Sequence, residues 1–415
     1  MDVLLTVARA RPVALRPVSE EAGLQPHATS QIPGSTVEAG RLRPAWAEID
    51  LAAIRGNVAV LAGIAAPAEM CAVVKAWGYG HGSVPVAEAA LEGGARWLAV
   101  ALVEEGRQLR DGGIDAPVLL LSEPAPAAMQ EVVASRLTPT IYTAAGLAAL
   151  SAAARAAGTV TDVHVKVDTG MHRVGTAPDL AVALAVEVER RGELRLQGFW
   201  THLAVADEVQ NPYTATQLTL FDSALEELAR RGIRPPLVHA ANSAGAMWHP
   251  AARYDMVRCG IALYGLAPAA HEATRQPVPQ LRPALSLVAR VSHVKEVAAG
   301  ERLSYGLRYQ VIEPTMVATV PLGYADGVTR SLSSTGGEVL VGGRRRPIAG
   351  TVTMDQTLVD CGPDAEVSVG DEVVLIGRQG DESIDAWEWA GRTGSIAYEV
   401  VCGVSGRVPR AYRST

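Results

Sequence analysis

The amino-acid sequence predicts an α/β protein in which an eight-stranded βα (TIM-like) barrel is followed by a mainly β C-terminal domain. Short apolar segments alternate with amphipathic helical patterns from residue 70 to residue 263, which is the alternation such a barrel needs. After residue 268, short Val-rich segments are separated by Gly, Pro and Asp turns, as in β structure. Only 5% of the residues are aromatic, which indicates an Ala, Val and Leu core typical of helix-covered parallel sheets.

The expected barrel strands are short and mostly separated by helical spacing of apolar residues. We expect strands at residues 70–76, 97–102, 118–121, 139–142, 162–167, 196–202, 237–241 and 255–263. Helices are expected at residues 54–64, 84–92, 104–110, 127–135, 144–156, 180–190 and 213–230. A doubly wound open sheet gives a similar alternation, so periodicity alone favours the barrel only modestly.

Three regions are expected along the chain. Residues 1–42 are rich in Ala, Pro, Ser, Gln and Gly without a period, which predicts a disordered tail. The barrel is assigned to residues 43–273 and the β domain to residues 274–410, although a first strand at residues 45–51 is compatible with packing on the β domain. The β strands are expected at residues 285–297, 316–320, 338–341, 346–350, 357–360 and 372–376, with a helix near 385–390.

Composition excludes several classes of function. The net charge is −7 and no basic stripe is present, so nucleic acid is not an expected partner. Four widely spaced cysteines form no CxxC pair and no metal-ligand cluster, which favours a reducing cytoplasm and no metal. No apolar run approaches the roughly 18 residues of a membrane span, and Asp2 stands where a signal peptide has positive charge.

The segment AVVKAWGYGHG, residues 72–82, places a lysine directly after an apolar strand. Burial at the mouth of such a strand disfavours the ammonium form of Lys75, so its amine can act as a nucleophile near neutral pH. Gly78, Gly80 and Gly82 allow positive φ angles or a close approach to a ligand. A lone lysine at this position more often extends to solvent, so the nucleophile needs support from other residues.

Polar residues also lie within, or directly after the end of, several other expected strands, and a βα barrel gathers its catalytic side chains where strands end and helices begin. In chain order they are Lys166, Asp168, Arg173, His202, Asn242, Ser243 and Arg258. The loops after the seventh and eighth strands offer the Ser243 hydroxyl and the backbone N–H groups of Gly260 and Ile261 to a phosphate. A phosphate site near a strand-end lysine suggests pyridoxal phosphate, although nucleotides and sugar phosphates use similar loops.

The segment around Lys75 resembles the pyridoxal-phosphate attachment signature of alanine racemases. Further segments follow that family's order from about residue 43 to residue 410: RPAWAEIDLAAIRGN, VKVDTGMHRVG, WTHLAVAD, HAANSAG, VRCGIALYGL, LSYG, PLGYADG, MDQ and YEVVCGVSGRVPR. The resemblance implies a cytoplasmic, pyridoxal 5'-phosphate-dependent isomerase that interconverts L-alanine and D-alanine and supplies D-alanine for peptidoglycan precursors.

The resemblance also implies a homodimer with shared active sites. Lys75 would hold the cofactor as an internal aldimine and act as one base, and Tyr305 of the partner subunit would act as the second. His202 would connect Tyr305 to Arg258, which would face the pyridine nitrogen. The implied phosphate contacts are Tyr79, Ser243, Gly260, Ile261 and Tyr398. The resemblance also implies four substrate residues. Arg173 would bind the substrate carboxylate, and Lys166, which is carbamylated in some members, would steady Arg173. Tyr324 and Met354 would line the substrate entrance and pocket.

Racemisation requires these bases on both sides of a planar carbanion. A free tyrosine titrates near pH ~10, so the chain through His202 to Arg258 must favour the phenolate of Tyr305. The pKa of arginine, above about 12, keeps the ring nitrogen unprotonated, which restrains transamination and decarboxylation. Trp77 and Gly78 depart from the family's commoner Asn or Asp followed by Ala, and Thr353 from its frequent Cys, but none of the three transfers a proton.

Three alternatives remain open. A racemase of the same mechanism with serine, lysine or broader specificity differs only in its pocket, where the bulk of Tyr305, Tyr324 and Met354 favours a small side chain. A barrel-type amino-acid decarboxylase usually has an acidic residue at the ring nitrogen and a cysteine near the reacting centre. A barrel that carries the cofactor without turnover generally lacks the second domain.

Overall fold

The computed structural model describes residues 42–270, 276–363 and 365–414. These described residues form one compact unit. The expected disordered tail lies outside the described residues except for Leu42, and so does the expected domain boundary between residues 273 and 274. Both expectations therefore stay predictions.

Eight parallel strands form the barrel, which confirms the predicted fold class. They are β2 (Glu69–Val73), β3 (Trp97–Val100), β4 (Val118–Leu120), β5 (Thr140–Ile141), β6 (Thr161–Lys166), β7 (Leu194–Trp200), β8 (Leu237–His239) and β9 (Met256–Cys259). The strands pair in two ladders of four, β4-β3-β2-β9 and β5-β6-β7-β8. One seam between the ladders is closed by a bridge from Leu119 to Thr138, and the other by the Arg258 N–H, which donates to the Ala241 carbonyl at 3.0 Å.

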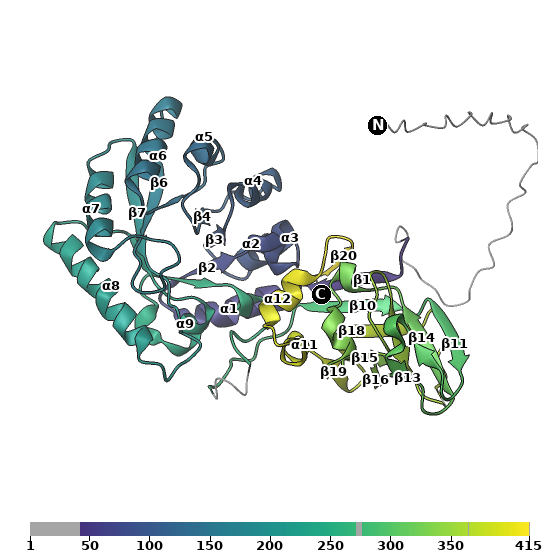
Figure 1. The fold of residues 1–415 in the computed structure, drawn as a ribbon. Helices are drawn as coiled ribbons and strands as arrows, with labels where there is room; N and C mark the ends of the chain where they lie inside the picture. Colours follow the sequence, from purple (N-terminus) through teal and green to yellow (C-terminus); the bar gives the residue numbers. More distant parts are fainter. Residues whose placement is uncertain (1–41, 271–275, 364, 415) are drawn as a thin grey trace, which may run out of the picture. The chain divides into compact units, whose positions relative to one another are not determined.

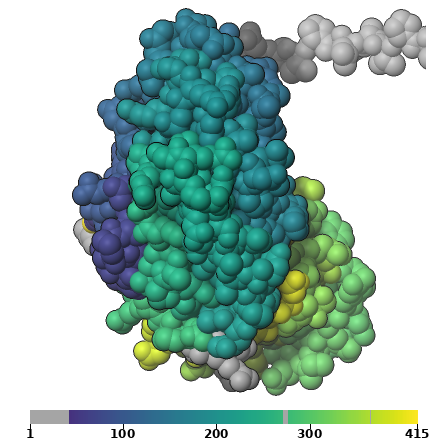
Figure 2. All heavy atoms as spheres, turned by 90° about the vertical axis from the view of Figure 1, so that its left-hand side faces the viewer, coloured from purple at the N-terminus to yellow at the C-terminus, as the bar shows by residue number. Residues whose placement is uncertain are grey.

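Helices surround these strands, as the purple-to-teal ribbons of Figure 1 show. They are α1 (Leu51–Ala65), α2 (Lys75–Tyr79), α3 (Ser83–Glu92), α4 (Val103–Asp111), α5 (Met129–Ala134), α6 (Ala144–Ala157), α7 (Pro178–Glu189), α8 (Tyr213–Arg230) and α9 (Ser243–Trp248). In the space-filling view of Figure 2, blue-to-teal residues of this part of the chain cover most of the visible face. No described helix is long and apolar enough to cross a membrane.

The β domain is organised around a mixed sheet that includes the first strand of the chain. Strand β1 (Ala45–Asp50) is antiparallel to β10 (Leu285–Arg290) and parallel to β20 (Arg410–Arg413). The sheet continues through β18 (Glu372–Gln379), β15 (Glu338–Val341) and β16 (Arg344–Pro347), and β19 (Glu382–Ile384) pairs with β18. The chain thus starts in the β-domain sheet and enters the barrel directly through α1.

Smaller sheets and two helices complete this domain. Strands β11 (His293–Val297), β14 (Thr315–Val320) and β17 (Thr357–Asp360) form one sheet, and β12 (Arg302–Leu303) and β13 (Tyr309–Gln310) form a hairpin. Helices α11 (Ala386–Thr393) and α12 (Ala397–Gly403) precede β20. The first of them corresponds to the helix that was expected near residues 385–390.

Several expected elements have different bounds in the structure. The strand expected at residues 285–297 is two strands, because the chain changes sheets at Val291 and Ser292, whose N–H groups donate to Asp371 and Thr319. The strand expected at residues 255–263 ends at Cys259, and Ile261–Tyr264 forms the 3-10 helix η3. Helices α2, α9 and α12 were not expected, because all three are too short to show a clear periodic pattern.

We predict that Phe221 contributes strongly to the stability of the barrel. Its ring is fully buried, stacks on Phe199 with centroids 5.8 Å apart and meets Tyr254 edge-on at 5.4 Å. Phe221→Ala should lower the free energy of unfolding by about 3–5 kcal/mol, because the substitution removes these contacts and leaves a cavity. Leu220→Ala, on the exposed side of the same helix, should change it by less than about 0.5 kcal/mol. Urea unfolding of both variants measures the difference, and equal effects would contradict the prediction.

Candidate active site

Lys75 stands at the start of a left-handed turn that follows β2. The strand ends at Val73, and residues 76–79 have φ angles of 52°, 55°, 60° and 50°. The expected positive φ angles of Gly78, Gly80 and Gly82 are confirmed. The left-handed conformation of Ala76, Trp77 and Tyr79 was not foreseen, because residues with a Cβ rarely adopt it.

The side chain of Lys75 is half-buried at the end of the first barrel strand. Burial lowers the pKa of Lys75, and the nearby positive charge of Arg173 lowers it further. The Glu105 carboxylate acts in the opposite direction and raises it. The amine therefore loses its proton more readily than an ordinary lysine, as expected for a lysine at the mouth of an apolar strand.

Arg258 lies inside the barrel with 3% of its surface exposed. Its Nη2 donates to the carbonyls of Thr201 and Ala240, both at 2.9 Å, and lies 3.1 Å from Nδ1 of His202. Its Nη1 lies 2.7 Å from Nδ1 of His239. No described carboxylate pairs with the guanidinium, so the charge is held by neutral acceptors. The structure thus brings together His202 and Arg258 as two of the predicted site residues.

This buried cation sets the charge of its neighbours. Burial, and next the charge of Arg258, lowers the pKa of both His202 and His239 well below the usual range, so both imidazoles are neutral. The same two causes, in the same order, lower the pKa of Lys166 to about 7. The Lys166 amine lies 4.1 Å from the centroid of the Trp200 ring, and the Arg258 guanidinium carbon lies 4.4 Å from it.

The loops after β8 and β9 form a cradle beside the Lys75 turn. The Ser243 hydroxyl accepts hydrogen bonds from the N–H groups of Gly260 at 2.9 Å and Ala262 at 3.4 Å. Ile261 begins η3, whose first N–H groups have no acceptor within the helix. A Cβ on Gly260 would lie 2.5 Å from the Tyr79 hydroxyl, so glycine permits this close approach.

Tyr398 reaches the same cradle from the C-terminal part of the chain. Its ring centroid lies 6.3 Å from that of Tyr79, because α12 packs against α2. The Tyr398 hydroxyl donates to the Pro268 carbonyl at 3.3 Å. All five residues expected at a phosphate therefore gather in one place, and their binding of a phosphate stays a prediction.

Three other predicted residues lie in the β domain. Tyr305 is 75% exposed in the short 3-10 helix η4 (Tyr305–Leu307), and no described hydrogen bond or ring contact joins its side chain to Lys75. Tyr324 and Met354 are adjacent, since the Ala325 N–H donates to the Met354 carbonyl at 3.0 Å, and both are exposed. A single chain therefore presents these side chains outward. Arg173 is exposed on the loop between β6 and α7, near enough to lower the pKa of Lys75 and Lys166.

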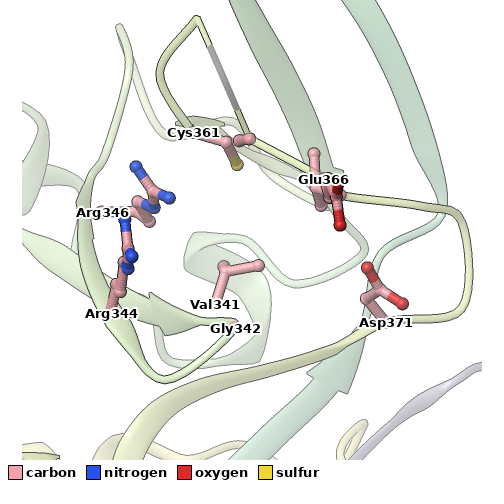
Figure 3. A pocket seen from close by; sticks show the side chains of 9 residues that line it. Val341, Gly342, Arg344, Arg346, Cys361, Glu366 and Asp371 are labelled. Carbon is pink, nitrogen blue, oxygen red and sulfur yellow. The ribbon is translucent and has the colours of Figure 1, made fainter.

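Two cavities lie away from this cluster. The first, of about 330 Å³, has Arg344 and Arg346 facing Glu366 and Asp371 across it (Figure 3). The second, of about 260 Å³, is lined by Arg308, Arg330 and Thr351 among others. Neither cavity is lined by Lys75, Arg258 or the cradle residues. The candidate active site is therefore identified from its side chains and not from the size of a cavity.

Comparison with known proteins agrees with this geometry. The family model described as "Alanine racemase, N-terminal domain" matches residues 49–268, and that described as "Alanine racemase, C-terminal domain" matches residues 284–412. An alanine racemase of Symbiobacterium thermophilum is 50% identical over 371 residues, which cover 89% of this chain and 97% of the relative. The chain belongs to the alanine racemase family. The resemblance inferred from the sequence is confirmed.

Solved structures of alanine racemases have the same fold. The alanine racemase of Bacillus anthracis with bound L-Ala-P superposes with a TM-score of 0.84 at 39% identity, covering 90% of this chain and 96% of that one. A histidine racemase of Leuconostoc mesenteroides subsp. sake superposes with a TM-score of 0.83 at 29% identity, covering 90% and 99%. Similarity to this fold is therefore compatible with more than one amino-acid substrate.

Sequence reasoning missed several residues that contact the candidate site of this alanine racemase family member. His239 and Trp200, which contact Arg258, begin the segments HAANSAG and WTHLAVAD, so their place at strand ends was the available signal. Arg410 donates to the Gly80 carbonyl at 2.9 and 2.7 Å and its guanidinium carbon lies 4.3 Å from the centroid of the Trp77 ring. No local pattern could indicate this contact, because the two segments are 330 residues apart.

We predict a pH-dependent stability contribution from Lys166. The folded protein releases this proton near pH 7, whereas the unfolded chain holds it to about 10.5. The unfolded state binds more protons in this window, so the free energy of unfolding rises with pH. As the pH rises, the free energy of unfolding of wild type should therefore increase relative to that of Lys166→Met, by at most about 1.4 kcal/mol per pH unit.

Urea unfolding in CO₂-free buffer between about pH 7 and about pH 9 measures this slope. Lys295→Met removes an exposed lysine and serves as the control, which should follow wild type. Parallel curves for wild type and Lys166→Met would show that the Lys166 amine keeps an ordinary pKa.

Proposed function

We propose that this chain interconverts L-alanine and D-alanine with bound pyridoxal 5'-phosphate. The observation that carries the proposal is the combination of Lys75, whose pKa is lowered, with the neighbouring cradle of Ser243, Gly260 and Tyr79. The hydroxyls and N–H groups of the cradle are the donors that a phosphate requires. Lys75 supplies the amine that the cofactor's aldehyde requires.

Bound pyridoxal phosphate would stabilise negative charge at the substrate Cα. Tyr79, Ser243, Gly260, Ile261 and Tyr398 would hold its phosphate. Arg258 would face its ring nitrogen. Among the described residues, the Nε–H of Arg258 makes no hydrogen bond, which leaves a donor free in addition to those that hold His202 and His239. Because the guanidinium keeps its proton, it favours an unprotonated ring nitrogen.

Two residues would move the proton at Cα. Lys75 can accept or return it on one face, since burial and Arg173 favour the neutral amine. Tyr305 of the partner subunit would do the same on the opposite face. Neutral His202, which lies 3.1 Å from Arg258, would hydrogen-bond the phenol oxygen and stabilise the phenolate. Arg173 would bind the substrate carboxylate, and Lys166 would steady it.

Lys166 is also a candidate for carbamylation. A carbamate forms from a neutral amine, and the pKa of Lys166 is lowered to about 7. The carbamate would place a negative charge near Arg173 and Arg258, two of the groups whose positive charge lowers that pKa. This modification would relieve the repulsion among three cationic side chains.

The dimer is part of the proposal because Tyr305 must come from elsewhere. Tyr305, Leu307, Ile312, Tyr324 and Met354 are exposed apolar or aromatic side chains of the β domain, with Ile312 84% exposed. Such side chains are typical of a surface that a second copy covers. In the cytoplasm of a bacterial host, D-alanine from this reaction would supply peptidoglycan precursors.

Specificity for alanine rests on the size of the proposed pocket. Tyr305, Tyr324 and Met354 would leave room for a small side chain only. Serine or broader specificity is the second candidate, favoured by the histidine racemase with the same fold. A decarboxylase fits less well, because Arg258 and not a carboxylate occupies the barrel interior.

We predict distinct effects of the two bases. Lys75→Ala should lose at least about 1000-fold of turnover in both directions, together with the absorbance of the lysine-bound cofactor. Tyr305→Phe should keep that absorbance and lose solvent proton exchange from L-alanine. A coupled assay measures turnover, and deuterium exchange measures the loss of the Cα proton. Detection of carbon dioxide would indicate a decarboxylase instead. Tyr309→Phe, in the same hairpin, is the matched control. Preferred turnover of L-serine or L-lysine would reject alanine specificity.

We predict that two inactive variants complement each other. In a mixed dimer of Lys75→Ala and Tyr305→Phe chains, one site has both mutations and the other has both native residues. Because half of the dimers are mixed after subunit exchange, activity should recover to about one quarter of wild type. Mixing either variant with itself is the control. Active monomers, or no recovery despite mixed dimers in native mass spectra, would contradict a shared site.

A further inference from the structure

Glu105 lies where the Lys75 turn meets the next loop of the barrel. Its Oε1 accepts a hydrogen bond from the Ala76 N–H at 2.6 Å. Its Oε2 accepts from the N–H groups of Ala101 at 2.8 Å and Leu102 at 3.1 Å. One carboxylate thus joins the residue after Lys75 to the loop between β3 and α4.

The turn needs such support because its backbone conformation is unfavourable. Ala76 is the first of five successive residues with positive φ, and three of the five are not glycines. Residues with a Cβ occupy this region only where the surrounding structure determines it. The bond from Ala76 to Glu105 fixes the start of the turn, and the contacts of Arg410 with Gly80 fix its end.

Glu105 also differs in charge from the other groups that face Lys75. Lys166 ends strand β6, and Arg173 lies in the loop after it. His202 follows β7, and Cys402 belongs to α12. Among these described groups, Glu105 is the carboxylate. Its negative charge opposes the effects of burial and of Arg173 on the amine.

We propose that Glu105 is a positioning residue for Lys75: it holds the left-handed turn through the Ala76 N–H and supplies the negative charge that balances the cations around the amine. The proposal rests on the proposed function only for the use of Lys75 by the cofactor. Its contacts with the backbone are made by this chain alone.

Glu104 provides a matched control. It precedes Glu105 in the same first turn of α4 and carries the same charge, but it is exposed and accepts no hydrogen bond among the described residues. Glu105→Gln removes the charge with little change of shape, and Glu105→Asp keeps the charge but shortens the reach. Glu104→Gln removes a charge from the same helix terminus.

The first measurement is the pH midpoint at which Lys75 of the cofactor-free protein reacts with an acylating reagent, followed by mass spectrometry of its peptide. Glu105→Gln should lower the midpoint by about one pH unit, so labelling below the midpoint becomes about tenfold faster. Glu105→Asp and Glu104→Gln should stay within about 0.3 units of wild type. A midpoint for Glu105→Gln equal to that of Glu104→Gln would overturn the electrostatic part.

The second measurement is the affinity for pyridoxal phosphate, followed by the absorbance of the bound cofactor. It is made at a pH above the labelling midpoints of wild type and of all three variants. Glu105→Gln and Glu105→Asp should each bind about tenfold more weakly, since the turn is no longer held, whereas Glu104→Gln should bind as wild type. Unchanged affinity in both Glu105 variants would overturn the positioning role. If wild type binds no cofactor, the proposed function fails, while the labelling midpoints still decide the role of Glu105.

Discussion

One buried cation, Arg258, organises the interior of the barrel. Removing a guanidinium from water costs several kcal/mol, and no carboxylate among the described residues offsets it. Two carbonyls and the ring nitrogens of His202 and His239 accept its hydrogen bonds instead, and its guanidinium lies over the face of Trp200. The pKa values of His202, His239 and Lys166 are lowered by burial and by this charge. The two imidazoles are therefore neutral near pH 7, and Lys166 titrates near that pH.

The second constraint is the left-handed turn that carries Lys75. Each residue with a Cβ in this conformation costs roughly 1–2 kcal/mol, and Ala76, Trp77 and Tyr79 all adopt it. The C-terminal segment contributes to holding it: Arg410 bonds to Gly80, and Gly82 allows the Tyr412 hydroxyl to approach. Because β20 pairs with β1, the β-domain sheet is connected to the turn of its own barrel. Trp77, one of the departures expected from the family resemblance, packs under Arg410 in this contact.

Most of the barrel could be predicted from the sequence because each strand has its own apolar segment and each helix its own periodicity. Lys75, His202 and Ser243 were found for the same reason, since they directly follow or end such segments, and Arg258 was found as a charged residue inside one of them. The sheet change at Val291 was missed, because a continuous apolar run gives no sign that its two halves pair with different partners. Glu105 was missed as well, because its neighbour Glu104 looks identical in sequence and only the fold brings one carboxylate to Ala76.

The sequence by itself determined the order of strands and helices, the family and the residue types that are available for chemistry, since these depend on local patterns and on ordered motifs. The tertiary structure decided which of these residues meet. It placed β1 in the β-domain sheet, brought Tyr398 to Tyr79 and left Tyr305 exposed. Contacts between residues hundreds of positions apart arise from packing of complete elements. Burial and charge act through space, so the lowered pKa of Lys166 became visible only when Arg258 and Trp200 surrounded it.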